Sequence, residues 1–168
     1  EQGLQQLVEK PGREEVSPVR FRAFLGGMRT LLAAIGREAV VQALEATDKA
    51  RAFVEVSGQQ ARYRGLSERE WLTPFGKITM LRRTYRADGA GSASAIPLDD
   101  ACGMRGRFMT PDVEEMAAIG MAMLTAPEVE KVLAKALPEG PSATAIQSAS
   151  HQRGEEIATH RAAIEAAI

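Results

Sequence analysis

The sequence predicts a mostly α-helical chain with a small antiparallel β insertion, an α+β fold. Apolar residues recur at helical spacing before residue 50 and again after residue 108. Between them lies a β-prone, partly alternating stretch punctuated by glycine. The predicted organisation is an N-terminal helical segment at 1–50, a small β module at 51–108 and a helix–turn–helix-like region at 109–168.

The N-terminal helix is predicted from a start signal and an apolar stripe. Ser17-Pro18 is typical of a helix start, with serine as the N-cap and proline in the first turn. Gly36 is a candidate break that would divide the segment into two helices. Spacings of three and four place seven apolar residues on one face, namely Phe21, Phe24, Leu25, Met28, Leu31, Leu32 and Ile35.

The β module is predicted from one short strand and one hairpin. Phe53-Val54-Glu55-Val56 is short and β-prone, and residues 70–86 predict a hairpin that turns near Phe75-Gly76. Residues 87–95 are small and predict a loop. Alternation assigns Ile78, Met80 and Arg82 to one face of the second strand and Lys77, Thr79 and Leu81 to the other.

Three further helices are predicted after residue 108. Thr110-Pro111 begins a helix that runs to about Leu124, Ala126-Pro127 begins another, and Ser142 caps the last. Residues 127–153 have the outline of a DNA-reading helix–turn–helix. Its second helix would offer Gln147, Ser148, His151, Gln152 and Arg153 to base edges or phosphates. The alternative is a plain helical hairpin in a bundle, since residues 112–168 hold four basic and nine acidic residues.

Positive charge concentrates in the middle of the chain. The whole sequence has a net charge of −1, which excludes a basic coat over the entire protein, but residues 51–107 hold ten basic against six acidic residues. Interleaved arginines and aromatics on strands can grip phosphates and stack bases. The alternative is a solvated β face over a small aromatic core. The predicted phosphate-binding residues here are Arg62, Arg64, Lys77, Arg82, Arg83 and Arg86.

The sequence predicts no catalytic residues, no metal ligands and no cofactor. Cys102 is the single cysteine, so a disulfide or a cysteine zinc site cannot form within one chain. Asp99, Asp100 and Asp112 are a weak carboxylate set for a metal, and His151 and His160 lie on roughly opposite helix faces. No nucleotide-binding glycine motif and no apolar span of about 20 residues is found. These features fit a cytoplasmic protein with no membrane partner.

Several motifs in order resemble a family of transposases. Thr73-Pro74-Phe75-Gly76-Lys77-Ile78-Thr79 with Arg82-Arg83-Thr84-Tyr85 resembles a strand pair of ISKra-type bacterial insertion-sequence transposases. Pro97-Leu98-Asp99 followed by Gly103-Met104 resembles their next segment, and Thr110-Pro111 opens a helix where theirs opens. Ser142-Ala143-Thr144-Ala145-Ile146 is similar to the start of their second helix–turn–helix element. The resemblance covers about residues 18–168.

The resemblance implies the N-terminal, non-catalytic region of such a transposase. It implies a helical arm, a small β module and helix–turn–helix DNA binding, with a metal-dependent nuclease domain downstream of Ile168. Relatives often carry two cysteine pairs that form a zinc ribbon around the strands. Here the equivalent positions, near Ser57-Gly58 and 87–91, hold no cysteine. A metal-free β module of this size is marginal alone, so we expect it to pack on the helices.

The function predicted from the sequence is recognition of transposon-end, double-stranded DNA in a bacterial cell, at the nucleoid, together with assembly into a homo-oligomer. The alternative is an oligomerisation or protein-interaction module with no DNA binding of its own. It would use the apolar stripe from Phe21 to Ile35 and the methionine-rich helix from Met116 to Met123. A stand-alone small enzyme ranks last, because the sequence offers no nucleophile with a base and no metal cluster.

Overall fold

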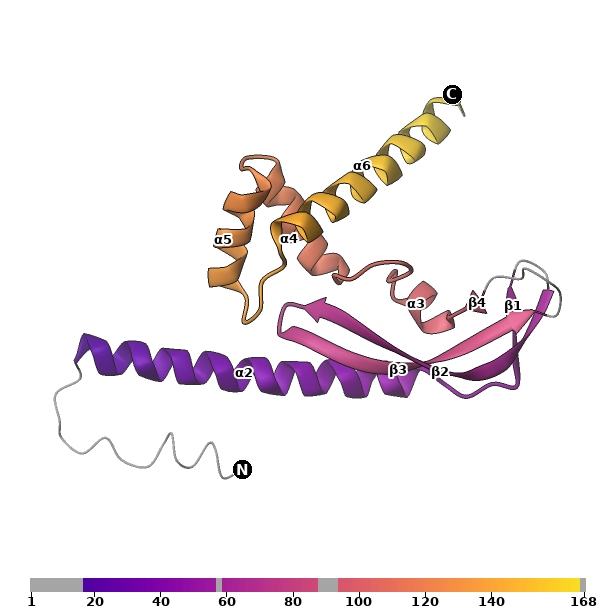
Figure 1. The fold of residues 1–168 in the computed structure, drawn as a ribbon, viewed down its shortest axis with the longest axis horizontal. Coiled ribbons are helices and arrows are strands. Elements are labelled where there is room, and N and C mark those ends of the chain that lie inside the picture. The colour runs from indigo at the N-terminus through magenta and orange to yellow at the C-terminus, as the bar shows by residue number, and fades with distance from the viewer. Residues whose placement is uncertain (1–16, 57–58, 88–93, 167–168) are drawn as a thin grey trace.

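A computed structural model describes residues 17–56, 59–87 and 94–166. Within these residues, the chain forms five helices and one four-stranded antiparallel sheet (Figure 1), which confirms the predicted α+β class. No helix among them combines the length and apolar character needed to cross a bilayer. A long helix lies along one side of the sheet, and three helices pack together near its hairpin end.

Helix α2 is a single helix, Pro18–Thr47. Its predicted start is confirmed, because the Ser17 side chain accepts a hydrogen bond from the Arg20 amide at 3.3 Å. The predicted break at Gly36 is wrong, since α2 continues through this residue without interruption. The Phe75 ring lies directly over Gly36, within 2.3 Å of where a Cβ would be. The glycine therefore makes room for an aromatic ring, and it does not end the helix.

The sheet is a meander in the order β1-β2-β3-β4. Its strands are β1 (Phe53–Val56), β2 (Gln59–Thr73), β3 (Gly76–Ala87) and β4 (Ser94–Ala95). The predicted hairpin is confirmed and extends further, because β2 begins eleven residues before residue 70. Its turn is closed by Thr73, whose hydroxyl donates to the Gly76 carbonyl at 2.7 Å and accepts from the Phe75 amide at 3.1 Å. Strand β4 lies within the segment predicted as a loop.

Strand β3 buries opposite faces in its two halves. Ile78, Met80 and Arg82 are buried in the first half, as the alternation predicts, and Tyr85 and Ala87 are buried in the second. The register of the facing strand shifts between Tyr63 and Gly65, opposite the change. A β-bulge adds twist and reorients the following side chains. The sheet therefore carries two separate apolar clusters, one toward each end.

The cluster at the hairpin end joins the sheet to the helices. Trp71, Ile78 and Met80 pack with Leu98 of helix α3 (Pro97–Ala101) and with Met104. Val40, Val41 and Leu44 of α2 pack against the same cluster. The β module thus shares its core with α2 and α3, which confirms the expectation that it packs on helices.

Helices α4 (Pro111–Met121), α5 (Ala126–Ala136) and α6 (Ala143–Ala166) share another core. Their predicted starts are confirmed, although α4 ends three residues before Leu124. The side chain of Leu72 of β2 is also part of this core. The Leu72 amide donates a hydrogen bond to the Phe108 carbonyl at 2.8 Å, which holds β2 beside the chain that leads into α4. The second half of α6 extends away from the other elements (Figure 1). A DNA-reading helix–turn–helix formed by α5 and α6 stays a prediction. The core residues of the trio include Val113, Ala117, Val129, Leu133 and Ile146.

Candidate nucleic-acid and assembly surfaces

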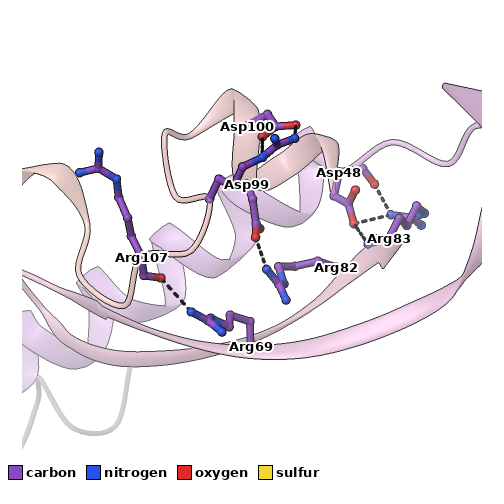
Figure 2. Close-up of polar contacts among 8 residues, drawn as sticks. Asp48, Arg69, Arg82, Arg83, Asp99, Asp100 and Arg107 are labelled. Atoms are coloured by element: carbon purple, nitrogen blue, oxygen red, sulfur yellow. Dashed lines mark hydrogen bonds and ion pairs between the residues drawn. The ribbon is translucent and has the colours of Figure 1, made fainter. Parts of the chain in front are cut away.

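Arg82 is a buried ion-pair partner of Asp99. The two side chains are 5% and 9% exposed, and Figure 2 shows Arg82 pointing from β3 toward Asp99 of α3. The guanidinium also lies 5.8 Å from the centre of the Trp71 ring. Two charges leave water together only when each neutralises the other. Arg82 therefore holds α3 on the sheet, and this corrects the expectation that it faces a phosphate backbone.

Arg83 is engaged at the end of α2. Its guanidinium contacts the Asp48 carboxylate at 3.1 Å and also donates to the Asp48 carbonyl. The Arg83 amide donates to the same carboxylate at 3.1 Å. Asp48 is buried and is the C-cap residue of α2. Because Arg83 neutralises this carboxylate, it ties α2 to β3 and is also removed from the predicted cationic surface.

The other predicted strand cations are exposed. Lys77 pairs with Glu70 at 3.2 Å across the hairpin. Arg62 and Arg86 are directly opposite each other on β2 and β3, so their side chains lie on the same face. Arg64 occupies the bulge between Tyr63 and Gly65. The structure thus gathers three exposed arginines at the end of the hairpin strands far from the turn, a smaller set than the sequence predicts.

The predicted DNA-reading residues of α6 are mostly accessible. Gln147, Ser148 and His151 are exposed, and their spacing places them on one helical face. Gln152 is half-buried, and Arg153 lies 3.6 Å from Glu156. The accessible side chains of this face are therefore mainly neutral hydrogen-bonding groups.

Arg107 is a structural hub that sequence reasoning missed. Its guanidinium pairs with Glu114 of α4 and with Glu156 of α6. Burial raises the pKa of the Glu114 carboxyl, against the opposing attraction of Arg107. The hydrogen bond from Arg107 lowers the pKa of Glu156. Spacing could not reveal this cluster, because its members lie up to 49 residues apart.

The apolar stripe of α2 is largely uncovered. Among its residues, Phe21 is 53%, Leu25 51%, Leu32 57% and Ile35 52% exposed. Arg29, on the same helix half, donates to the carbonyls of Lys135 and Ala136 at the end of α5. A cation at a helix C-terminus satisfies unpaired carbonyls and complements the helix dipole. This contact fixes the position of α2 beside α5 while the stripe stays open to solvent.

No group of three or more potential metal ligands occurs among the described residues. Asp99 is paired with Arg82, as Figure 2 shows. Asp100 pairs with Arg105 at 2.6 Å. Burial, with a smaller contribution from Asp99, raises the pKa of the Cys102 thiol. A thiol in this environment stays protonated and weakly nucleophilic.

Comparisons with known proteins found no matching family model, no matching curated protein and no matching solved structure.

Proposed function

We propose that this chain is a non-catalytic assembly unit of an insertion-sequence transposase, in which α2 pairs with α2 of a second copy. One observation carries the proposal: an apolar stripe on the first half of a long helix is largely exposed to solvent. Large exposed apolar patches on proteins commonly mark interaction sites. The transposase context rests on the motif resemblance alone.

The spacing of the stripe favours a helix as its partner. Phe21, Leu25, Met28, Leu32 and Ile35 follow intervals of four, three, four and three residues, the repeat of helices that pair along their length. The flanking residues Phe24 and Leu31 widen the stripe beyond a narrow seam. A helix of the same kind offers matching knobs and holes.

Charge favours an antiparallel pair of copies. Residues 18–37 contain no acidic residue, whereas Glu38 and Glu45 follow in the second half of the helix. Either orientation sets residues 18–37 of the two copies side by side, but a parallel pair would place Glu38 beside Glu38 of the other copy. An antiparallel pair centred on Met28 sets Phe21 opposite Ile35 and brings Arg22 within about one turn of Glu38 of the other copy. Such a two-fold contact uses the same surface on both copies and closes as a dimer.

The oligomeric state tests the pairing. Sedimentation velocity over a concentration series should give a dimer for the unaltered chain and a monomer for Leu32→Glu. Leu81→Glu is the matched control, because Leu81 is 56% exposed on β3 and Leu32 is 57% exposed on α2. A chain that stays monomeric at all concentrations would contradict the proposal, as would equal loss of the dimer in both variants.

DNA contact is a second proposed function, supported by the exposed side chains of two surfaces. Arg62, Arg64 and Arg86 would contact phosphates, and Gln147 and His151 of α6 would read base edges. Neither of these two surfaces includes a residue of the α2 stripe, so the proposed pairing of α2 does not use them.

A salt series separates this function from assembly alone. Fluorescence anisotropy with terminal inverted-repeat DNA should show an affinity that falls with salt. The double variant Arg62→Gln with Arg86→Gln should reduce the slope of log affinity against log salt by about 2. Arg161→Gln, which removes one exposed charge outside the stripe and outside both proposed DNA-contacting surfaces, should leave the slope unchanged. A salt-independent signal, or equal slopes for all three chains, leaves assembly as the only function.

A further inference from the structure

A small cavity lies between the sheet and the loop that follows α3. Its volume is about 220 Å³, and its walls include Arg69 of β2, Arg82 of β3, Ser94 of β4, Asp99 of α3 and Arg105 of the loop. Figure 2 shows Arg69, Arg82 and Asp99 near one another beneath the α3 turn. The cavity thus gathers three guanidinium groups from three separate segments of the chain.

Two atoms of the buried ion pair have no hydrogen-bond partner. Arg82 and Asp99 bond through Nη1 and Oδ2, which leaves Arg82 Nε and Asp99 Oδ1 buried and unpartnered. Both side chains are more than nine-tenths buried. An unpartnered buried donor or acceptor is costly, and a bound group commonly satisfies it. Both residues line the cavity, and each keeps one unpartnered polar atom buried behind its wall.

The charge of the cavity favours an anion. Arg69 donates a hydrogen bond to the Arg107 carbonyl at 3.3 Å. A carbonyl carries no net charge, so this bond does not neutralise the Arg69 guanidinium. Arg105 is paired with Asp100, and Arg82 with Asp99. These three arginines therefore exceed the two aspartates by one charge. A planar guanidinium with several N–H donors suits the oxygens of phosphate.

We propose that this cavity binds a phosphate monoester group. Its oxygens accept hydrogen bonds from Arg69 and Arg105. The side chains of Arg82 and Asp99 turn toward the bound group, so that Arg82 Nε donates to it and its P–OH donates to Asp99 Oδ1. A cavity of about 220 Å³ exceeds the ~30 Å³ share of one water several-fold, so it has room for a tetrahedral oxyanion. A phosphodiester and a sulfate have no proton to donate near neutral pH. The carboxylate therefore selects the monoester, and this inference does not depend on the pairing of α2.

Calorimetric titration with inorganic phosphate and with sulfate tests the site. At about pH 6, near the second pKa of a phosphate monoester, a large share of the ligand carries the required proton. Phosphate should bind at least about tenfold more tightly than sulfate, since a buried carboxylate without a donor repels an anion. Equal binding of the two ions, or no binding of either, would overturn the proposal.

Variants locate the binding. Arg105→Gln should weaken phosphate binding by about tenfold, because it removes one charge-assisted donor. Arg161→Gln is the matched control, since both arginine side chains are mostly exposed, 70% and 79%, and each pairs with one carboxylate. Asp99→Asn should abolish the preference for phosphate over sulfate. If Asp99→Asn does not fold, the Arg105 comparison decides alone, and equal effects of the two arginine variants would refute the site.

Two probes distinguish free phosphate from a nucleic-acid end. A short oligonucleotide with a 5′-phosphate is compared with its unphosphorylated twin as a competitor of inorganic phosphate. Competition by the phosphorylated strand alone supports a phosphate at a strand end. No competition by either strand, with inorganic phosphate still bound, supports a small free phosphate compound.

Discussion

Arg82 of β3 and Asp99 of α3 form an ion pair whose side chains are 5% and 9% exposed. This ion pair joins the centre of the hairpin to the short helix that covers it (Figure 2). It also changes the interpretation of the central arginines. Arg82 and Arg83 stabilise the fold through Asp99 and Asp48, whereas Arg62, Arg64 and Arg86 are exposed on the sheet.

Removal of the Asp99 carboxylate should destabilise the protein strongly. Asp99→Ala leaves the Arg82 guanidinium buried without a counter-charge, and such a loss costs about 3–5 kcal/mol. The neighbouring Asp100→Ala breaks an exposed pair with Arg105 and should cost less than about 1 kcal/mol. Urea unfolding followed by circular dichroism measures both. Similar midpoints for the two variants would show that the buried pair does not stabilise the fold.

Two helical glycines should respond to alanine in opposite directions. A Cβ at Gly120 of α4 would lie 2.9 Å from Cγ1 of Val129, a buried and stiff side chain of α5, so Gly120→Ala should destabilise by about 1–2 kcal/mol. Gly26 of α2 has no atom within 4 Å of such a Cβ. Gly26→Ala should therefore gain about 0.5–1 kcal/mol from helix propensity. Thermal unfolding of both variants checks the signs, and a gain in both would contradict the close α4–α5 contact.

Glu156 should contribute stability that depends on pH. Arg107 lowers the pKa of Glu156 in the folded state below its value in the unfolded chain. Its contribution is therefore present above about pH 4.3 and is lost as the pH falls through the folded-state pKa. Glu156→Gln should be less stable than the unaltered chain at pH 7, and the difference should shrink toward pH 3. Urea unfolding at pH 7, 5 and 3 measures this difference. The exposed neighbour variant Glu155→Gln should match the unaltered chain throughout, and a Glu156→Gln deficit that stays constant down to pH 3 would exclude the linkage.

Local signals in the sequence predicted most elements of the fold. Ser17-Pro18 sets the start of α2, and alternation at Ile78 and Met80 identifies the buried face of β3. These signals act over a few residues, so they can be read from the sequence. The role of Gly36 could not be read this way, because the residue that explains it, Phe75, is distant along the chain.

The candidate surfaces were predicted less completely than the fold. The local sequence around a basic residue on a strand is the same whether its side chain faces solvent or pairs with a carboxylate that is distant along the chain. Asp99 lies 17 residues after Arg82, and Asp48 lies 35 residues before Arg83, so neither pairing has a local signature. The stripe of α2 was predicted as an apolar face, but its exposure depends on which elements pack against it. Only the tertiary arrangement shows that this face is uncovered.

Cysteine cross-linking at Met28 tests the central proposal most directly. In a Cys102→Ser background, Met28→Cys places one thiol at the centre of the proposed antiparallel α2 pair, where the two copies meet. Mild oxidation should convert this variant to a covalent dimer, while Leu81→Cys, on the sheet, should stay monomeric. Equal cross-linking of both variants, or none at Met28→Cys, would contradict the pairing of α2 between copies.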